Sequence, residues 1–440
     1  MKKTILLITP ENREINRFRR KQFNNFIQIT MPYLAAFIDE SKYEITLVDE
    51  YNQRIPYDRD FSLVALTVNT SNATHCYEIA KIFKEKGSKI VMGGPHVTLL
   101  PDETEEHCDY IIIGEAEETW PIFLNDFYHS TPSDRYSCSN IPSLNKLPIP
   151  RRDLIGKRYF TKGAVFATRG CPYKCSYCNL KQIYCDEFRV RPVEDVIEDI
   201  RSIKSKYFVF WDDNFFGDIN YVKSLMKELK KLKKKWAAQV TLERCKDEEL
   251  LQLAKESGCM YLFIGLESFS EENLQEVNKG INDVMKYKKI INAIHTYGIS
   301  VQAGIIFGFD HDRKDTFEAT LKACNNLGID GTTVSILTPL PQTPLYQQLK
   351  KEERLLSKDW RHYNGKTSVV YKPKNMTKEE LYEGYMWFRR EFYSFKSILK
   401  RMIISKTNIM HNLIVNLGYK LSIRENGFKK ANKDIETKHN

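Results

Sequence analysis

Long apolar runs are missing from this 440-residue sequence, and their absence narrows the class of protein. No window approaches the roughly 20 apolar residues that a transmembrane helix needs. The apolar run near the start, residues 5–8, is far too short for the hydrophobic core of a signal peptide and is followed by charged residues. We therefore expect a soluble, cytoplasmic protein.

A strong excess of one charge is also missing. The 67 basic and 57 acidic residues give a net charge of +10, which is mild for this length. Basic residues gather in helix-like runs such as 227–235, which indicates a solvated face, and no basic motif interleaved with aromatic residues is present. We expect no nucleic-acid partner. The hydrophobic content of 42% is typical of folded cores and not of a disordered chain.

The cysteines do not form the pattern of a disulfide framework. There are ten of them, and only those between residues 171 and 185 stand close together. In a reducing compartment an isolated cysteine is usually a small buried residue, whereas clustered cysteines hold a metal or act in catalysis. The group at 171–185 is therefore the first candidate for a functional site.

Residues 1–130 alternate short apolar runs with helix-like stretches. We predict strands at 4–10, 44–48, 63–69, 88–92 and 110–113. Continuous apolar strands separated by helices are typical of a parallel sheet that is covered on both faces. This pattern predicts an α/β domain with a doubly wound, Rossmann-like parallel sheet.

A second α/β domain follows a segment without periodicity. Residues 131–158 contain four prolines and several serines, which indicates a linker. Residues 159–350 contain six strand–helix units, with strands expected at 164–168, 207–211, 238–242, 261–266, 301–307 and 333–337. Six units are fewer than the eight of a closed TIM barrel and predict a partial (β/α)6 barrel. Residues 351–440 lose the strands and are expected to be helical, with residues 425–440 frayed.

Three cysteines at CxxxCxxC spacing follow the first strand of the predicted barrel. Cys171, Cys175 and Cys178 are close enough in sequence to point at one metal centre. Three thiolates on a [4Fe–4S] cubane leave one iron without a protein ligand, and that iron can bind a chelating group of a small molecule. A zinc site with Cys185 as the fourth ligand, or an incidental grouping, are the alternatives that the spacing leaves open.

These residues resemble a known family. The CxxxCxxC motif after the first barrel strand, the six-unit barrel and Tyr177 just before the third cysteine resemble the radical S-adenosylmethionine (SAM) superfamily. The resemblance implies that the three cysteines hold a [4Fe–4S] cluster whose open iron chelates the amino and carboxylate groups of SAM. An electron from the cluster then cleaves SAM into methionine and a 5′-deoxyadenosyl radical. Cys185 has no counterpart in the family and stays unassigned.

Other strand ends resemble the SAM-contacting positions of this family. The GGE motif of the family is absent, and WDDNFFGD (211–218) stands in its place. The alternative interpretation of this segment is an acidic turn without a function. GLES (265–268) lies at the barrel mouth, and GIIFGF (304–309) resembles the segment that packs against adenine. Arg244 follows the third strand, and its guanidinium group could contact the SAM carboxylate. A surface salt bridge is the alternative role for Arg244. The expected SAM-contacting residues are Asp212, Asp213, Asn214, Arg244, Glu267 and Gly304.

The loops after the strands of the first domain suit a phosphate-bearing or flat ligand. They contain small, hydroxyl and glycine residues, and doubly wound sheets bind ligands at these strand ends. A GxGxxG motif after the first strand is missing, which argues against a nicotinamide or flavin cofactor. The expected binding residues are Asn69, Thr70, Ser71, Gly93, Gly94, Gly114 and Glu115.

Residues 48–50, 66–103 and 110–120 resemble the cobalamin-binding domain that precedes the barrel in cobalamin-dependent radical SAM enzymes. The resemblance implies that cobalamin lies over the barrel mouth. The DxHxxG motif, whose histidine binds cobalt from below, is missing here, as in many members of the family. The lower ligand is then absent or water, with His96 in a structural turn. A Rossmann-like scaffold with an empty groove is the alternative.

The combined resemblance implies an enzyme. We expect it to methylate an unactivated carbon of a small-molecule or lipid substrate, with a [4Fe–4S] cluster, SAM and cobalamin as cofactors. A reductase, flavodoxin or ferredoxin would donate the electron. Ring formation or rearrangement without methyl transfer is the alternative within the family, and a non-catalytic metal or cobalamin sensor is the alternative outside it. The sequence identifies no catalytic residue.

The predicted C-terminal helices carry apolar residues at helical spacing between residues 398 and 421, beside several lysines and arginines. Such a stripe more often packs in a core or against a partner than against a membrane. Contact of these helices with a membrane surface is the other interpretation, and it would suit a lipid-like substrate.

Overall fold

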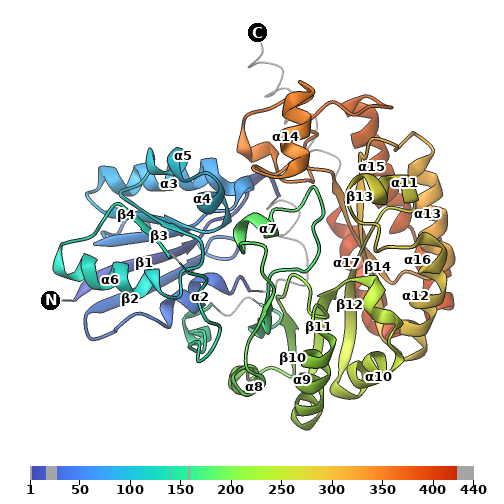
Figure 1. Cartoon of the computed structure of the whole chain (residues 1–440), viewed down its shortest axis with the longest axis horizontal. Helices are drawn as coiled ribbons and strands as arrows, with labels where there is room; N and C mark the ends of the chain where they lie inside the picture. Colours follow the sequence, from blue (N-terminus) through green and yellow to red (C-terminus); the bar gives the residue numbers. More distant parts are fainter. Residues whose placement is uncertain (1, 16–26, 139, 157–158, 424–440) are drawn as a thin grey trace.

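The computed structural model describes residues 2–15, 27–138, 140–156 and 159–423. Two parallel sheets lie side by side, and the helices near the end of the chain pack against the second sheet (Figure 1). The predicted α/β architecture is confirmed. The frayed end predicted for residues 425–440 lies outside the described residues.

The first sheet has six parallel strands in the order β2-β1-β3-β4-β5-β6. They are β1 (Lys3–Thr9), β2 (Tyr43–Asp49), β3 (Leu63–Thr67), β4 (Lys89–Gly93), β5 (Tyr110–Ile113) and β6 (Arg135–Ser137). Helices cover both faces of the central strands, so side chains that point to either face of the sheet are buried. Residues 5–8 of β1, for example, are all fully buried. The strand order reverses beside β1, as in other doubly wound sheets.

Helices from the same domain cover the two faces of this sheet. One face holds α3 (Ala73–Glu85) and α4 (Pro95–Leu99), followed by α5 (Pro101–Glu105). The other face holds α2 (Thr30–Ala35) and α6 (Thr119–His129). β6 falls within the predicted linker, so the sheet extends beyond residue 130. With three residues, this strand is too short to leave a pattern among the surrounding prolines and serines.

The second sheet has six parallel strands in the order β14-β13-β12-β11-β10-β7, which is also their order along the chain. The strands are β7 (Ala164–Val165), β10 (Tyr207–Phe210), β11 (Lys235–Val240), β12 (Cys259–Glu267), β13 (Ser300–Phe307) and β14 (Gly331–Ile336). Between them lie α8 (Val193–Ser202), α9 (Ile219–Leu232), α10 (Glu248–Ser257), α11 (Glu271–Glu276), α12 (Tyr287–Thr296) and α13 (Thr316–Leu327). β7 and β14 are the two edges of the sheet, so the barrel is open, as predicted.

The first barrel strand is shorter than the predicted strand at 164–168. Instead of continuing β7, the chain forms β8 (Thr168–Arg169), which pairs antiparallel with β9 (Arg189–Val190). The carboxylate of Asp212 accepts hydrogen bonds from the N–H groups of Ala167 and Thr168, so these groups are not available to the parallel ladder. The β8–β9 pair brings together the two ends of the loop that contains the cysteine motif.

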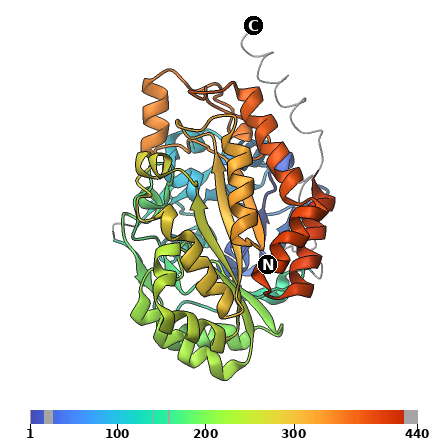
Figure 2. The same cartoon turned by 90° about the vertical axis from the view of Figure 1, so that its right-hand side faces the viewer.

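The C-terminal region contains α14 (Pro344–Lys351), α15 (Lys378–Phe392), α16 (Phe395–Ser405) and α17 (Ile409–Ser422). α15 and α16 are separate helices because Ser394 is extended and accepts a hydrogen bond from the N–H of Ser397, which caps α16. The last three helices pack on one side of the barrel (Figure 2). None of the described helices is both long and apolar enough to cross a membrane.

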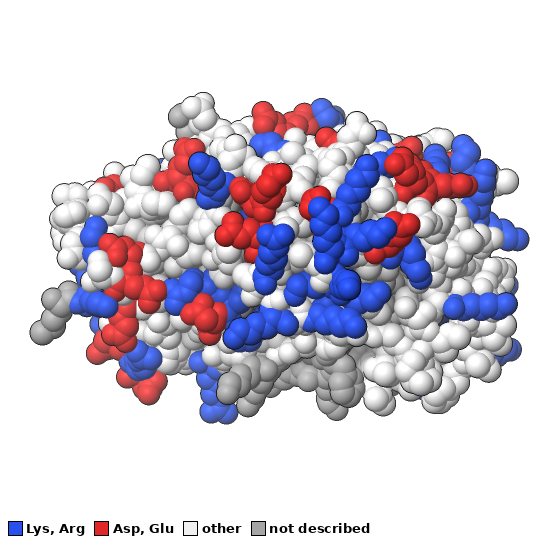
Figure 3. All heavy atoms as spheres, turned by 90° about the horizontal axis from the view of Figure 1, so that it is seen from below, with Lys and Arg blue, Asp and Glu red and all other residues white. Residues whose placement is uncertain are grey.

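Figure 3 shows the face that carries α8, α9 and α10, where lysine and arginine side chains gather. Several lysines of α9 pair with carboxylates of the same face: Lys223 with Asp247 and Glu249, Lys230 with Glu256, and Lys231 with Glu228. Exposed pairs of this kind are typical of a solvated helix face, as predicted for the run at 227–235. The absence of a nucleic-acid partner stays a prediction.

Candidate active site

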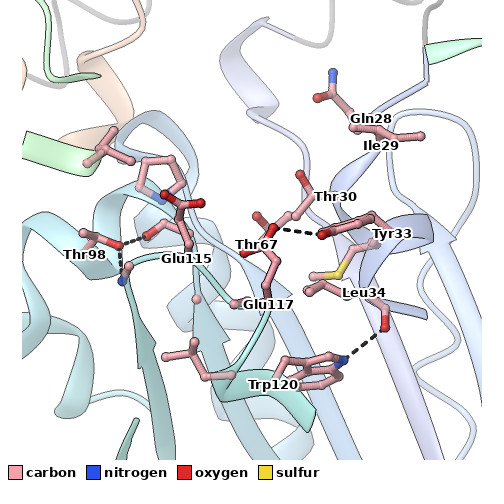
Figure 4. Close-up of a pocket in the computed structure, with 18 of the residues that line it drawn as sticks. Gln28, Ile29, Thr30, Tyr33, Leu34, Thr67, Thr98, Glu115, Glu117 and Trp120 are labelled. Carbon is pink, nitrogen blue, oxygen red and sulfur yellow. Dashed lines mark hydrogen bonds between the residues drawn. The ribbon is translucent and has the colours of Figure 1, made fainter. Parts of the chain in front are cut away.

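A cavity of 480 Å³ lies between the two sheets, at the carboxyl ends of the strands of the first sheet. Residues that follow β1, β3, β4 and β5 line one side (Figure 4), and residues around β8 and the end of β10 line the other. Five of the seven residues predicted to bind cobalamin line it: Asn69, Gly93, Gly94, Gly114 and Glu115. The remaining two, Thr70 and Ser71, are not part of this lining. The first domain and the barrel therefore face one another across a shared cavity.

Thr70 takes part in a buried cluster around His96. The Nδ1 atom of His96 lies 3.4 Å from the Thr70 hydroxyl oxygen, and its Nε2 atom lies 3.2 Å from the Tyr77 hydroxyl oxygen and 3.5 Å from Glu103. Both ring nitrogens thus have protein partners, which agrees with the structural turn expected for His96. None of the described residues that line the cavity is a histidine.

Backbone atoms line the cavity at the ends of β4 and β5. The hydroxyl group of Thr98 donates to the carbonyl of Gly94 at 3.1 Å and accepts from the N–H of Gly114 at 2.9 Å, which ties the two loops together (Figure 4). Gly114 has a φ of +80°, and the place that a Cβ atom would occupy there is open. A flat ligand can lie directly on this backbone, so the site fits the planar ring of cobalamin.

A buried ion network joins the two domains at the wall of this cavity. Arg169 of β8 pairs with Glu117 at 2.6 Å and also with Glu115, and Arg189 of β9 pairs with Glu115 as well. The hydroxyl of Tyr33 donates to Glu117 at 2.9 Å (Figure 4). Burial raises the pKa of the Glu117 carboxyl, but Arg169 and Tyr33 outweigh it and hold that pKa below its ordinary value. The network fixes the strand before the cysteine motif to the first domain.

The three cysteines of the CxxxCxxC motif lie on the loop between β8 and α7 (Leu180–Ile183), and each is partly buried. Burial raises the pKa of the Cys171, Cys175 and Cys178 thiols, that of Cys178 to about 12. The neighbouring thiols of the motif add to the rise at Cys171 and Cys178. Since a metal binds the thiolate, loading this site must release protons.

The zinc alternative would need several thiolates close together around one ion. Among all residues that the structure describes, no three His, Cys, Asp or Glu side chains converge at a position for one ion. Thiolates on one tetrahedral zinc, with Zn–S distances of about 2.3 Å, must lie within about 4 Å of one another. A cubane places each ligand on a separate iron and so spaces the ligands more widely. Cys185, the fourth ligand of the zinc alternative, is exposed and lies beyond α7.

Two contacts hold the cysteine loop in shape. Gly170 has a φ of +88°, and a Cβ atom there would lie 2.1 Å from the carbonyl oxygen of Glu187, so the position requires glycine. The N–H of Ser176 donates to the carbonyl of Val277 at 3.0 Å. The second contact connects the loop to the segment after α11, far along the chain.

The three residues in place of GGE have different environments. The carboxylate of Asp212 accepts from the Thr168 hydroxyl at 2.6 Å as well as from two backbone N–H groups, and burial raises its pKa to about 7. Asp212 thus has protein partners in Ala167 and Thr168, and its contact with SAM stays a prediction. Asp213 lines the cavity, and burial raises its pKa to about 6. Asn214 is 1% exposed, and within the described structure both polar atoms of its side chain lack a hydrogen-bond partner.

The end of β12 places a buried ion pair beside the cysteine motif. Glu267 pairs with Lys279 at 3.3 Å, and both side chains are largely buried. Burial lowers the pKa of the Lys279 ammonium group, but Glu267 and the thiols of Cys175 and Cys171 outweigh it and raise that pKa overall. Lys279 is therefore a buried positive charge next to two of the three cysteines.

The other predicted SAM-contacting residues lie on the barrel side. Gly304 of β13 is directly opposite Gly265 of β12, so neither strand projects a side chain at this point. Arg244 lies in a 3-10 helix after β11, and its buried Nε atom is 3.5 Å from Glu243 without a hydrogen bond. None of Arg244, Glu267 and Gly304 lines the cavity between the sheets.

Comparisons with known proteins agree with this division. The family model "Radical SAM superfamily" matches residues 165–324, "B12 binding domain" matches residues 24–124, and a domain of unknown function (DUF4070) matches residues 343–419. The sequence is 30% identical over 390 residues to bacteriochlorophyllide d C-12(1)-methyltransferase of Chlorobaculum tepidum, and the match covers 85% of each chain. The chain belongs to the cobalamin-dependent radical SAM family.

Two further proteins are similar to this radical SAM chain, one in sequence and one in fold. It is 28% identical over 291 residues to hopanoid C-2 methylase of Rhodopseudomonas palustris, a match that covers 62% of this chain and 55% of that protein. Its fold is similar to the solved structure of the cobalamin-dependent SAM radical enzyme OxsB with aqua-cobalamin and SAM bound. That similarity has a TM-score of 0.67 at 17% identity and covers 100% of this chain and 75% of OxsB.

Family membership confirms the predicted enzyme class. The chain combines a B12-binding domain with a radical SAM domain, and it is a radical SAM methyltransferase with a [4Fe–4S] cluster, SAM and cobalamin as its cofactors. The B12-binding match ends after the loop that carries Glu115, and the radical SAM match begins at β7. The cavity therefore lies where the two matched domains meet, and the alternative of a non-catalytic sensor loses its support.

Sequence reasoning missed three charged residues of this radical SAM enzyme. Arg169 stands two positions before the first cysteine, and Glu117 stands two positions after Glu115, so closeness to a motif was their only signal. Lys279 is about a hundred residues from the motif, and no sequence pattern connects it to the cysteines. The contact between Ser176 and Val277 connects the segment of Lys279 to the loop that carries the cysteines.

Proposed function

We propose that this enzyme methylates an unactivated carbon of a small-molecule or lipid-like substrate. The observation that carries the proposal is the cavity between the B12-binding sheet and the first barrel strands, beside the cysteine motif. Relatives named as bacteriochlorophyllide and hopanoid methylases support carbon methylation and this class of substrate. When bound, the cluster and SAM supply the 5′-deoxyadenosyl radical, and cobalamin supplies the methyl group.

In this proposal Cys171, Cys175 and Cys178 are the cluster ligands. Their position on one loop and their partial burial support it. The buried ammonium group of Lys279 offsets part of the negative charge that three thiolates bring to the site. Cys185 is not included, because it is exposed and lies beyond α7.

The chain's own residues would then hold the other two cofactors on opposite sides of the cysteine loop. Cobalamin would lie in the cavity on the loops of Asn69, Gly93, Gly94, Gly114 and Glu115, whose open backbone at the ends of β4 and β5 supports the assignment. SAM would lie on the barrel side, where the unpaired amide of Asn214 and the guanidinium of Arg244 can meet its polar groups and where Gly304 stands opposite Gly265 of β12. Glu267, fixed by Lys279, would complete that side.

The proposal also includes an electron donor and a location. A cluster that gives an electron to SAM must be reduced by another protein, and a reductase, flavodoxin or ferredoxin has the required chemistry. We propose the cytoplasm as the location, where thiols stay reduced and such donors are present.

Anaerobically purified protein, reconstituted with iron, sulfide and hydroxocobalamin, tests the proposed function. We expect about four irons per chain, one bound cobalamin and the visible absorption of both. With SAM, a low-potential reductant and a substrate, 5′-deoxyadenosine and S-adenosylhomocysteine should both form. Formation of 5′-deoxyadenosine alone would favour ring formation or rearrangement, and protein that holds zinc in place of iron would contradict the proposal.

The Lys279→Met variant is expected to have a cluster with a lower reduction potential than the wild type. A positive charge beside the cluster stabilises the reduced form, which carries one more negative charge. We expect a shift on the order of tens of millivolts, measured by redox titration with electron paramagnetic resonance. Lys230→Met, which removes an exposed lysine paired with Glu256, is the control and should leave the potential unchanged. An unchanged potential in Lys279→Met would show that the cluster lies elsewhere.

A further inference from the structure

Helices α16 and α17 expose rows of large apolar side chains. On α16, Phe395, Leu399 and Ile403 stand four residues apart and are 68%, 62% and 63% exposed. On α17, Met410 and Ile414 are 72% and 55% exposed. The full set, called the α16–α17 face below, is Phe395, Leu399, Ile403, Ile404, Ile409, Met410, Leu413, Ile414 and Leu421. Contiguous apolar surface of this kind usually marks a contact with another molecule.

The rows on the two helices belong to one surface. The ammonium group of Lys420, near the end of α17, lies 4.3 Å from the centre of the Phe395 ring at the start of α16. The end of one helix therefore adjoins the start of the other, and the two helices are in contact. Both lie on the same side of the barrel in Figure 2.

Hydrogen bonds hold α17 with its polar side inward. The buried amide of Asn412 donates to Asp330 Oδ1 at 2.7 Å and to the carbonyl of Thr407 at 2.8 Å. One turn later, the amide of Asn416 donates to the carbonyl of Asp330 at 2.8 Å and its side-chain oxygen accepts from Arg401 at 2.9 Å. A helix that faces water normally buries its apolar side, and α17 does the opposite. Rotating the helix to hide its apolar side would break these buried hydrogen bonds.

Core packing therefore does not explain most of the apolar stripe recognised in the sequence. Ile398 is buried, as core packing requires, but Leu399, Ile403, Met410 and Ile414 are exposed. Since hydrogen bonds to the barrel set the orientation of α17, its apolar side is held outward. The face is thus a surface that the described part of the chain leaves open.

The helices of the α16–α17 face carry several basic residues. Residues 392–424 contain no aspartate or glutamate. Three lysines of this region, Lys396, Lys400 and Lys406, are exposed, and Lys420 is partly exposed. Within the described part of the chain none of these lysines forms an ion pair, and Lys400 bonds to the neutral amide of an asparagine. The face therefore combines apolar side chains with lysines that form no ion pair within the described residues.

The apolar and basic residues of the face argue against several molecules that could cover it. Residues 424–440 offer only Phe428 and Ile435 as large apolar side chains, too few to cover nine. A second copy of the chain would bring two sets of these lysines together without carboxylates between them. Protein interfaces centre on tryptophan, tyrosine and arginine, whereas this face has Phe395 and otherwise aliphatic residues and methionine.

An apolar helix face that also carries lysines matches the boundary between the headgroups and acyl chains of an anionic bilayer. We propose that the α16–α17 face docks on the surface of an anionic lipid membrane, with its apolar side chains at the acyl boundary and its lysines among the headgroups. The inference goes beyond the proposed function and does not depend on the cofactors. It places the enzyme at the surface where a lipid-like substrate would be found.

Co-sedimentation of the full-length protein with vesicles tests this inference. The protein should pellet with vesicles of equal parts phosphatidylcholine and phosphatidylglycerol and bind at least about tenfold more weakly to phosphatidylcholine alone. A variant with Met410→Ser, Leu413→Ser and Ile414→Ser should bind the anionic vesicles at least about tenfold more weakly, because it has lost apolar area at the bilayer. The control, Ile122→Ser with Met285→Ser, removes two exposed apolar residues outside the face and should bind as the wild type does.

Three results would overturn the inference. The first is wild-type protein that stays in the supernatant with anionic vesicles. The second is a triple variant that binds as well as the wild type while its circular dichroism spectrum shows an unchanged fold. The third is a wild-type dimer in sedimentation velocity that becomes a monomer in the triple variant, which would make the face a contact between copies of the chain. Formation of 5′-deoxyadenosine by the triple variant should be unchanged, so the test is separate from that of the proposed function.

Discussion

The Cys175→Ala variant is expected to lose both its iron–sulfur cluster and the cleavage of SAM. Cys175 is the central cysteine of the motif, and its thiol is buried beside the Glu267–Lys279 pair. Without it, two thiolates would have to hold the cubane. Changes to residues that only orient a metal ligand cost about 10–100-fold in affinity, so loss of a ligand should lower iron content and 5′-deoxyadenosine formation by at least about 100-fold. Iron, sulfide and product analysis of the anaerobically reconstituted variant measure both effects.

Cys185→Ala is the matched control for this prediction. Cys185 lies in the same part of the chain but is exposed, and the proposed cluster does not use it. This variant should keep the iron content and the SAM cleavage of the wild type. Loss of metal from Cys185→Ala, together with zinc in the wild type, would instead support the four-cysteine zinc site that the spacing alone left open.

The sequence was sufficient to predict both sheets because their strands are continuous apolar runs between helical segments. Predicted strands at 63–69 and 301–307 correspond to β3 and β13, and the open barrel followed from the number of units. β6 was missed because three residues, Arg135–Ser137, carry no periodicity. The first barrel strand was predicted too long because its sequence does not show that the Asp212 carboxylate takes hydrogen bonds from backbone groups 45 and 44 residues away.

The candidate site was predictable where residues cluster along the chain and not where the fold brings distant residues together. The cysteine motif and the glycines at the ends of β4 and β5 are local patterns. Lys279 and the pairing of Arg169 with Glu117 depend on contacts between distant segments, so no local pattern in the sequence indicates them. α17 shows a third limit: helical spacing identifies its two faces, but only the hydrogen bonds of Asn412 and Asn416 decide which face is buried.

Loss of the Arg169 side chain is expected to have the largest effect on stability. In Arg169→Met, Glu117 would keep a neutral partner in Tyr33, and Glu115 would keep Arg189, but the positive charge shared by both carboxylates would be gone. Removing one partner from a buried ion pair costs about 3–5 kcal/mol, because the remaining charge stays buried without compensation. We expect the unfolding temperature of the apoprotein to fall by roughly 3–5 °C, measured by thermal unfolding followed with circular dichroism.

Arg151→Met is the matched control, because Arg151 also joins two carboxylates, Glu40 and Asp153, but these are exposed to solvent. Exposed pairs contribute about 0–1 kcal/mol, so this variant should unfold within about 1 °C of the wild type. If the cost in Arg169→Met arises from a buried, uncompensated carboxylate, adding Glu117→Gln should recover part of the loss, since a neutral amide tolerates burial better than a carboxylate. Equal unfolding temperatures for Arg169→Met and Arg151→Met would mean that the network between the two domains is open to water and does not fix the cysteine loop against the B12-binding sheet.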